Sequence, residues 1–299
     1  MSSIRFFRTF VAVARTGSFA AASERVSLTP AAVGLQMRSL ELDLDQVLFD
    51  RSGKVVVLSD AGHRLIPRAE RLLALYEELR YDTDDPTQFV GSLTVGSIST
   101  SMALLTRAVL LMRSSHPKLV VSPSINYSSD LALRVRDQEL DAAIAVKSKH
   151  KAPAGSQWTP LYKEPFVFVS NRAIDGDAPL QQILDKRLFL KSAMQTDTGS
   201  LIQAFMRREN LAVAEHLEMN SLRTMVELVQ QGVGVTVVPL PKYSSWESDP
   251  GLRVTRFDDL DAHRIIGLFE NESRNRLTSV VRRVMVTMLA DEESVGPVV

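Results

Sequence analysis

The chain has 299 residues, enough for two or three domains, and its 45% hydrophobic and 23% charged residues are typical of a globular protein. The absence of cysteine excludes a disulfide framework and thiolate metal sites, and 35 basic against 35 acidic residues give no overall charge that would indicate a nucleic-acid partner. Arg5, Arg8 and Arg15 interrupt the N-terminal apolar stretch, and no apolar run approaches the roughly 20 residues that a membrane helix needs, so we expect neither a signal peptide nor a membrane span.

Three helices are predicted at the start of the chain. Apolar side chains over residues 7–14 recur at helical spacing, and Gly17 can end that helix in a left-handed conformation. Ser18 is a good N-cap for a second, short helix. Thr29 and Pro30 begin a third helix, because threonine caps well and proline at the first helical position loses no hydrogen bond.

The third predicted helix has two different faces. Val33, Met37, Leu40 and Leu44 form an inward apolar stripe on a helical wheel. The opposite face carries small, apolar and basic side chains, and with the start of the helix it forms the surface that we expect to contact DNA: Thr29, Pro30, Ala31, Gly34, Leu35 and Arg38. Two helices joined by a short turn, with such an outward face on the second, are typical of a helix-turn-helix.

A basic-tipped hairpin is predicted next. The apolar runs 47–49 and 55–58 flank a turn that carries Arg51 and Lys54. A hairpin of this kind beside a recognition helix can serve as a wing that reaches the DNA backbone or the minor groove. The alternative is that both residues are solvated turn charges.

These segments resemble the LysR-type transcriptional regulators. The matching residues are 17–22, 29–33 with Leu40 and Glu41, 48–51, and 59–62. The resemblance implies a winged helix-turn-helix over residues 1–60. The chain departs from the family at three positions, where the family usually has serine, a polar residue and glycine: Gly34, Leu35 and Asp45.

A heptad seam follows the hairpin, with spacings of four and three residues: Leu65, Ala69, Leu72, Tyr76 and Leu79. Ser59 or Asp60 can cap this helix, and Pro67 is expected to kink it. A helix packed on its own domain would show the same pattern. We expect instead a dimerising linker helix with its hinge over residues 61–86, as in LysR-type regulators, where tetramers are also usual.

Strands and helices alternate from Gly91 onward, which predicts an α/β architecture. The region 87–299 resembles the effector domain of the same family, a two-lobed α/β fold like the type 2 periplasmic binding proteins, on segments such as 91–96, 139–144 and 229–235. The resemblance implies a first lobe of about 91–162 plus 269–299 and a second lobe of about 163–268.

Three loops rich in hydroxyl and amide groups, at 97–101, 126–129 and 195–200, follow predicted strands. Open α/β sheets bind ligands where strands end and helices begin. The expected effector-binding residues are Ser99, Thr100, Ser101, Ser128, Thr196 and Thr198. Plain helix capping would explain any one of them. Because helix N-termini attract anions, we expect a small carboxylate whose apolar remainder contacts Ile98 and Phe189.

The sequence therefore predicts a cytoplasmic LysR-type transcription regulator that binds promoter DNA, a small-molecule effector and further copies of itself, and that contacts RNA polymerase. No catalytic residue, cofactor or metal site is predicted, since the five histidines have no ligand spacing and no catalytic motif occurs. The alternative is a solute-binding protein or an enzyme of the same two-lobed fold.

Overall fold

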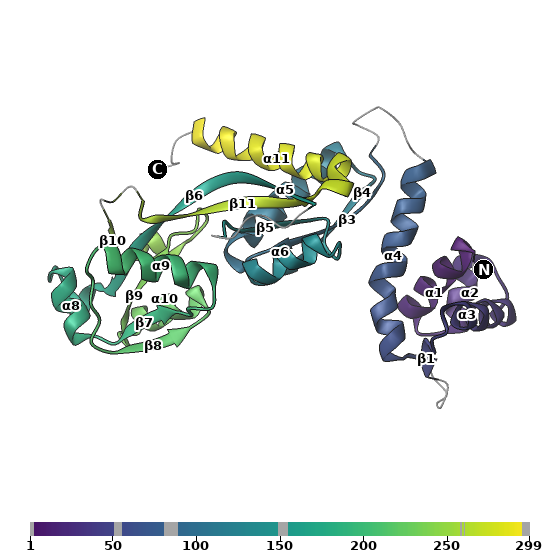
Figure 1. Cartoon of the computed structure of the whole chain (residues 1–299), viewed down its shortest axis with the longest axis horizontal. Helices are drawn as coiled ribbons and strands as arrows, with labels where there is room; N and C mark the ends of the chain where they lie inside the picture. The colour runs from purple at the N-terminus through teal and green to yellow at the C-terminus, as the bar shows by residue number, and fades with distance from the viewer. Residues whose placement is uncertain are drawn as a thin grey trace. The chain divides into compact units, whose positions relative to one another are not determined.

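The structure is a computed structural model that describes residues 3–50, 56–80, 89–148, 155–257, 259 and 261–294 (Figure 1). Its contacts divide the chain into two compact units, the first of Met1–Ser92 with Lys118–Val120 and the second of Leu93–Pro117 with Val121–Val299. Within the described ranges, no helix combines the length and the apolar character needed to cross a membrane.

The first unit begins with the three predicted helices, α1 (Ile4–Thr16), α2 (Phe19–Val26) and α3 (Pro30–Leu44). Their ends follow from local chemistry. Gly17 adopts the left-handed conformation with a φ of 65°, and the Ser18 side chain accepts a hydrogen bond from the Ala21 amide at 3.4 Å. The Thr29 hydroxyl caps α3 by accepting from the Ala32 amide at 3.2 Å. These predicted helix boundaries are confirmed.

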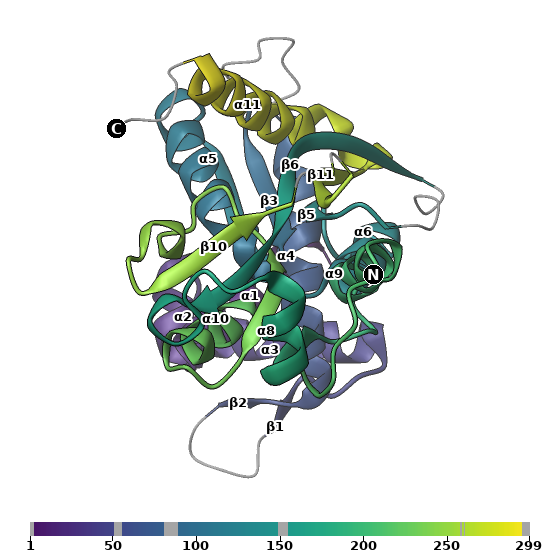
Figure 2. The ribbon, with the colours of Figure 1, turned by 90° about the vertical axis from the view of Figure 1, so that its left-hand side faces the viewer.

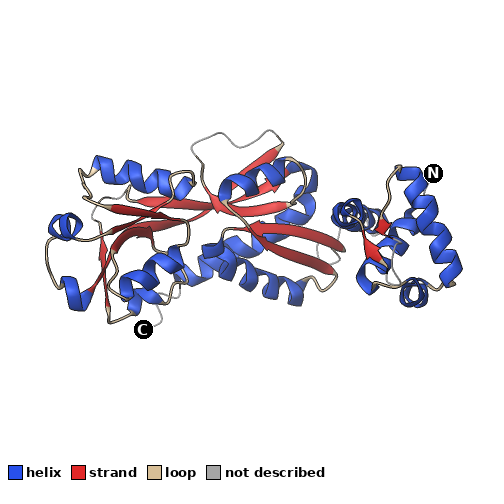
Figure 3. Cartoon of the chain, turned by 90° about the horizontal axis from the view of Figure 1, so that it is seen from below, coloured by secondary structure: helices blue, strands red, loops and turns tan. Residues whose placement is uncertain are grey.

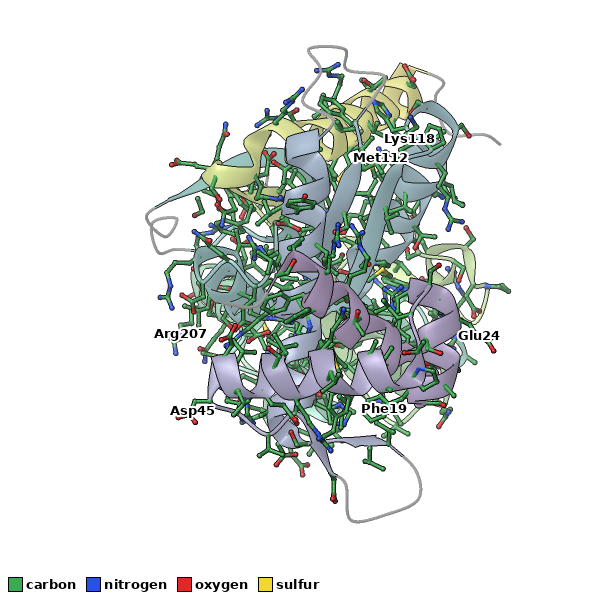
Figure 4. All side chains as sticks on the ribbon, turned by 90° about the vertical axis from the view of Figure 1, so that its right-hand side faces the viewer. Phe19, Glu24, Asp45, Met112, Lys118 and Arg207 are labelled. Atoms are coloured by element: carbon green, nitrogen blue, oxygen red, sulfur yellow. The ribbon has the colours of Figure 1, made fainter. Side chains whose placement is uncertain are left out.

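Asp45 ends α3 in a left-handed conformation, with a φ of 49° (Figure 4). A side chain with a Cβ is strained there, which gives a physical reason for the glycine that the family resemblance led us to expect at this position. The inward stripe of α3 is buried as predicted, with Val33, Met37 and Leu40 fully inaccessible. They join the core of the first unit with Phe10, among others.

A short antiparallel hairpin follows α3, made of β1 (Phe49–Asp50) and β2 (Val57–Leu58). Glu41 holds its start, because one carboxylate oxygen accepts from the Leu48 and Phe49 amides at 2.8 and 3.2 Å. The hairpin is present as predicted, with strands shorter than the apolar runs 47–49 and 55–58, whereas Arg51 and Lys54 of its turn lie outside the described residues.

Helix α4 (Asp60–Arg80) runs on without a break through Pro67. Ser59 caps it by accepting from the Gly62 amide at 3.0 Å. A Cβ on Gly62 would lie 2.3 Å from the Leu48 carbonyl oxygen, so only glycine allows this close approach. Arg15 of α1 and Glu70 of α4 form an ion pair at 2.8 Å. The first half of α4 is therefore part of the helix-turn-helix domain.

The second unit is built on one mixed sheet. Its described strands are β3 (Gly91–Ser97), β4 (Leu119–Ile125), β5 (Ala142–Val146), β6 (Ser156–Asn171), β7 (Phe189–Ser192), β8 (His216–Met219), β9 (Val235–Pro239), β10 (Leu252–Arg256) and β11 (His263–Asn271). They are arranged in the order β4-β3-β5-β11-β6-β9-β7-β8, and β10 also pairs with β6. Figure 3 shows helices on both sides of these strands.

The helices of this unit come mostly between strands, as in other α/β folds. They are α5 (Met102–Ser115), α6 (Ser128–Arg136), α7 (Arg172–Asp175), α8 (Leu180–Lys186), α9 (Asp197–Arg208), α10 (Leu222–Gln230) and α11 (Asn275–Ser294), with short 3-10 turns such as η2 (Ser99–Ser101). Helix α11 packs along α5 (Figure 2).

Two long strands connect the two lobes of the second unit. We call the part with β3, β4 and β5 the first lobe and the part with β7, β8, β9 and β10 the second lobe. Strand β11 pairs with β5 in the first lobe and with the first half of β6, whereas the second half of β6 pairs with β9 and β10. β6 therefore continues unbroken across the boundary predicted between residues 162 and 163.

The second half of β6 is covered on both faces. Phe166 and Phe168 belong to a cluster with Phe205 of α9, while Val167 and Val169 belong to another with Met225 of α10. This alternation follows from the two-residue period of a strand. Phe189 lies in the first of these clusters and is 1% exposed, so it is a core residue of the second lobe.

Candidate functional site

A cavity of about 430 Å³ lies in the second unit, among the starts of η2, α6, α9 and α10. We call it the interlobe cavity, because both lobes contribute to its wall. Five of the six predicted effector-binding residues line it: Ser99, Thr100, Ser128, Thr196 and Thr198. The polar loops that follow the carboxyl ends of the strands therefore converge on one cavity, as in other open α/β sheets.

The structure does not place Ser101 on the wall of the interlobe cavity, in contrast to the other five predicted residues. Ser101 is completely buried, and its hydroxyl lies 3.1 Å from the Tyr162 hydroxyl. Burial raises the pKa of Tyr162, which keeps this phenol protonated and able to donate. Phe189, which was expected to contact the effector, lies in the core of the second lobe and not on the cavity wall.

The capping alternative holds for Thr196. Its hydroxyl accepts from the Gly199 amide at 3.0 Å and donates to the Ala193 carbonyl at 2.7 Å, which makes it the N-cap of α9. Ser128 accepts from the Val146 amide at 3.1 Å. Thr198 and Thr100 have a different partner, which sequence reasoning missed.

That partner is Arg264 of β11, the basic side chain on the cavity wall. Its guanidinium donates to Oγ1 of Thr198 at 2.7 Å and to Oγ1 of Thr100 at 2.9 Å. It also donates to a carboxylate oxygen of Glu164 at 2.7 Å, and both members of this ion pair are at most 5% exposed. Arg264 therefore connects Thr100 of the first lobe to Thr198 of the second.

The rest of the cavity wall is mixed. Asp197 contributes a carboxylate beside the start of α9, and a hydrogen bond of 3.0 Å from Asn220 to the Tyr127 hydroxyl joins residues from the two lobes. The apolar part of the wall consists of Ile98, Ile125, Val146, Ala193, Met219, Leu222, Met225 and Pro239. The cavity can therefore hold a small molecule with a polar and an apolar end.

In the first unit, the predicted DNA-facing residues of α3 share one surface. Leu35 is 66% exposed, and Thr29, Pro30, Ala31 and Arg38 are also exposed. Gly34 is half-buried, and a Cβ built on it would meet no atom within 4 Å. The surface is open along this face of the helix, as a groove-binding helix requires.

The predicted dimer seam divides into two parts. Ala69 is 1% exposed and Leu65 is half-buried, and both pack against the core of their own unit, as expected for a helix packed on its own domain. Leu72 and Tyr76 are 39% and 40% exposed, as is the neighbouring Leu75 at 39%. Leu79 lies in α4, but its side chain is outside the described residues.

Comparison with known families agrees with this two-part organisation. A family model described as bacterial regulatory helix-turn-helix protein, lysR family, matches residues 4–63, and one described as LysR substrate binding domain matches residues 86–290. The chain belongs to the LysR family. It is thus a transcription regulator with a winged helix-turn-helix and an effector-binding domain, and the alternative of a solute-binding protein or an enzyme is wrong.

Related proteins cover nearly the whole of this LysR-type regulator. A probable RuBisCO transcriptional regulator of Cyanophora paradoxa is 26% identical over 284 residues, which cover 91% of this chain and 87% of that protein. A full-length OxyR variant from Pseudomonas aeruginosa is 22% identical with a TM-score of 0.63, covering 95% of each chain. CbnR in complex with its target DNA is 19% identical with a TM-score of 0.62, covering 94% of this chain and 99% of that one. The two structures support the fold.

Proposed function

We propose that this LysR-type regulator responds to a small carboxylate bound in the interlobe cavity. The observation that carries the proposal is the convergence of four helical N-termini on a hydroxyl-lined cavity of about 430 Å³. Helix N-termini expose unpaired amide groups and a partial positive charge, which favour an anion. The apolar end of such a ligand would lie against side chains such as Ile98 and Met225. Binding would favour one arrangement of the two lobes over another and so change the regulator on DNA.

The experiment is a gel shift on the DNA upstream of the regulator's own gene, with and without a panel of small carboxylates. The double substitution Ser99→Ala with Thr198→Ala should abolish the effect of an active carboxylate while operator affinity without it stays within a few fold. A matched double variant, Ser114→Ala with Ser122→Ala, removes two exposed hydroxyls outside the cavity and should respond normally. An effector without an acidic group, or a normal response in the first variant, contradicts the proposal.

For operator binding, we propose that α3 enters the major groove with the six predicted residues at or near the DNA. Arg38 would contact phosphate or guanine, and Leu35 would favour a thymine methyl group because it cannot hydrogen-bond a base edge.

Arg51 and Lys54 of the hairpin tip would contact phosphate or the minor groove. Replacing both with alanine should weaken binding to all sequences alike and flatten the salt dependence by about one unit of slope per lost contact. An unchanged slope would argue against the wing.

We further propose that two chains pair through the exposed side chains Leu72, Leu75 and Tyr76 of α4, and that two such dimers form a tetramer. Three exposed apolar side chains on one helix face favour a helical partner.

As a promoter-binding protein, the regulator would work in the cytoplasm and contact RNA polymerase. A two-hybrid assay between the full chain and the polymerase subunits tests that contact, and a negative result with every subunit would remove it.

A further inference from the structure

Most N–H groups of Arg264 are engaged before any ligand binds. Nε and Nη2 lie 2.7 and 2.5 Å from one carboxylate oxygen of Glu164. Nη2 also donates to Oγ1 of Thr100 at 2.9 Å, and Nη1 donates to Oγ1 of Thr198 at 2.7 Å. A single planar group thus fixes the positions of two threonine hydroxyls that line the interlobe cavity.

This arrangement determines which way each hydroxyl hydrogen points. A guanidinium has donors and no acceptor, so Thr100 and Thr198 must both accept from Arg264. Each hydroxyl hydrogen is then directed away from Arg264. Among the residues that the structure describes, no acceptor is found for either hydrogen. Thr196 differs, because its hydrogen is given to the Ala193 carbonyl. Thr100 and Thr198 therefore offer two neighbouring donors to a ligand.

The charge of Arg264 is already balanced by Glu164. The two residues are directly opposite in the antiparallel pairing of β11 with β6, and both are buried. A ligand in the cavity therefore contacts the neutral hydroxyl groups of Thr100 and Thr198. The positive charge of Arg264 is already paired with Glu164. The planar fork of arginine keeps this orientation, which the single ammonium group of lysine would not reproduce.

We propose that Arg264 is a positioning residue that fixes the hydrogen-bond polarity of the interlobe cavity, so that the cavity accepts a group with two neighbouring acceptor oxygens and rejects one that brings a donor. A carboxylate is such a group, whereas its primary amide sets an NH2 group against one of the hydroxyl hydrogens. The amide binds more weakly, because its NH2 group can donate to the remaining lone pair of a threonine oxygen only if the hydroxyl hydrogen turns away and is left without an acceptor. This inference rests on the proposed carboxylate effector.

The test measures the dissociation constants of full-length protein for three carboxylates and their amides: acetate and acetamide, succinate and succinamide, benzoate and benzamide. The unmodified protein should bind at least one acid at least tenfold more tightly than the matching amide. Thr198→Val removes one donor at nearly constant volume and should reduce this preference to threefold or less. Thr198→Ser keeps the hydroxyl and should keep the preference for the acid. A purely structural role of residue 198 would instead make the preference depend on the size of the side chain, which valine preserves better than serine.

Arg264 itself is tested by replacing both ion-pair members with glutamine, Arg264→Gln with Glu164→Gln, so that no buried charge is left alone. A glutamine amide both donates and accepts, so the threonine hydroxyls are no longer forced to accept, and the preference for the acid should again fall to threefold or less. If this variant does not fold, the comparison of Thr198→Val with Thr198→Ser still tests the proposal, because both variants keep the Arg264–Glu164 ion pair.

The outcomes separate the two proposals. If none of the acids binds the unmodified protein, the carboxylate effector is wrong, and this inference falls with it. If an acid binds and the preference survives in Thr198→Val or in the folded double variant, the carboxylate effector stands and the role of Arg264 is wrong. Loss of the preference in Thr198→Ser also overturns the proposed role of Arg264, since a hydroxyl at residue 198 would then not be sufficient for the preference.

Discussion

Arg264 of β11 lies directly opposite Glu164 of β6, where the two long strands pass between the lobes. The ion pair that they form is buried, and the second carboxylate oxygen of Glu164 has no hydrogen-bond partner among the described residues. A buried pair of this kind contributes little net stability compared with neutral residues of the same size, but it becomes costly when one partner is lost.

We therefore expect Glu164→Gln alone to lower the free energy of unfolding of the second unit by about 3 kcal/mol, because it leaves Arg264 buried without its counter-charge. Adding Arg264→Gln should restore part of that loss. Urea unfolding followed by tryptophan fluorescence measures this unit specifically, since Trp158 and Trp246 are the two tryptophans of the chain. A single variant as stable as the parent would contradict the expectation.

Asp197→Asn should tighten binding of a carboxylate effector several-fold, on the order of 1 kcal/mol, because a negative side chain on the cavity wall is neutralised. The same change should lower stability by about 0.5 kcal/mol, since Asp197 lies in the first turn of α9. Asp130→Asn is the matched control. It also lies in the first turn of its helix, but it is not on the cavity wall, so affinity should not change. Weaker binding in Asp197→Asn would indicate a ligand with a donor at that position.

Gly34→Ala should stabilise the first unit by about 1 kcal/mol, because alanine is the better helix former and the added Cβ meets open space. If the α3 backbone approaches DNA closely at this position, operator affinity should fall at the same time. Hydrogen exchange of α3 peptides measures the first effect, and a gel shift measures the second. Greater stability with unchanged affinity would show that Gly34 is merely tolerated on this surface.

Asp45→Gly should also stabilise the first unit, by about 0.5 to 1 kcal/mol, because glycine adopts a φ of 49° without the steric cost of a Cβ. Asp45→Val should destabilise it by about 1 to 2 kcal/mol, since a β-branched side chain is least compatible with that conformation. Hydrogen exchange of the peptides that end α3 is the measurement. Equal exchange in both variants would mean that the helix end rearranges freely.

Leu72→Glu should raise the dissociation constant of the dimer at least about 100-fold and abolish operator binding, because a buried, unpaired charge would replace an apolar contact. His63→Glu is the control for the oligomeric state, at an exposed position of the same helix on the face opposite Leu72. Sedimentation velocity reports the oligomeric state. A Leu72→Glu protein that sediments like the parent would remove α4 from the interface.

The features predicted correctly from sequence are those that depend on neighbouring residues. The caps at Ser18, Thr29 and Ser59 each satisfy a backbone amide three residues further along, so the local sequence contains all the information required. The alternation of apolar segments was likewise sufficient for the α/β class. The first half of β6 was not predicted. It contains Pro160 and Pro165 and a register shift opposite Gly267, which obscure the strand pattern.

Arg264 could not be found in the same way, because its partners are distant in sequence. Thr198, Glu164 and Thr100 are 66, 100 and 164 residues away, and only the fold brings them to one place. The seam of α4 has a related difficulty. A heptad repeat shows that a stripe will be covered, but not by which chain, and Leu65 and Ala69 turn out to be covered by their own domain.

The packing of α4 has a consequence for how a signal could reach DNA. Its first half is held to α1 by buried Ala69 and by the Arg15–Glu70 ion pair, and its start is held against the hairpin at Gly62. The recognition helix α3 and the first half of α4 are therefore parts of one packed domain. If two chains pair along α4 through Leu72, Leu75 and Tyr76, the crossing angle of the two α4 helices sets the separation of the recognition helices. It therefore also sets the spacing of operator half-sites that the dimer can span. A change of a few degrees in that angle would be enough to move the preferred spacing, with no change in any residue that touches a base.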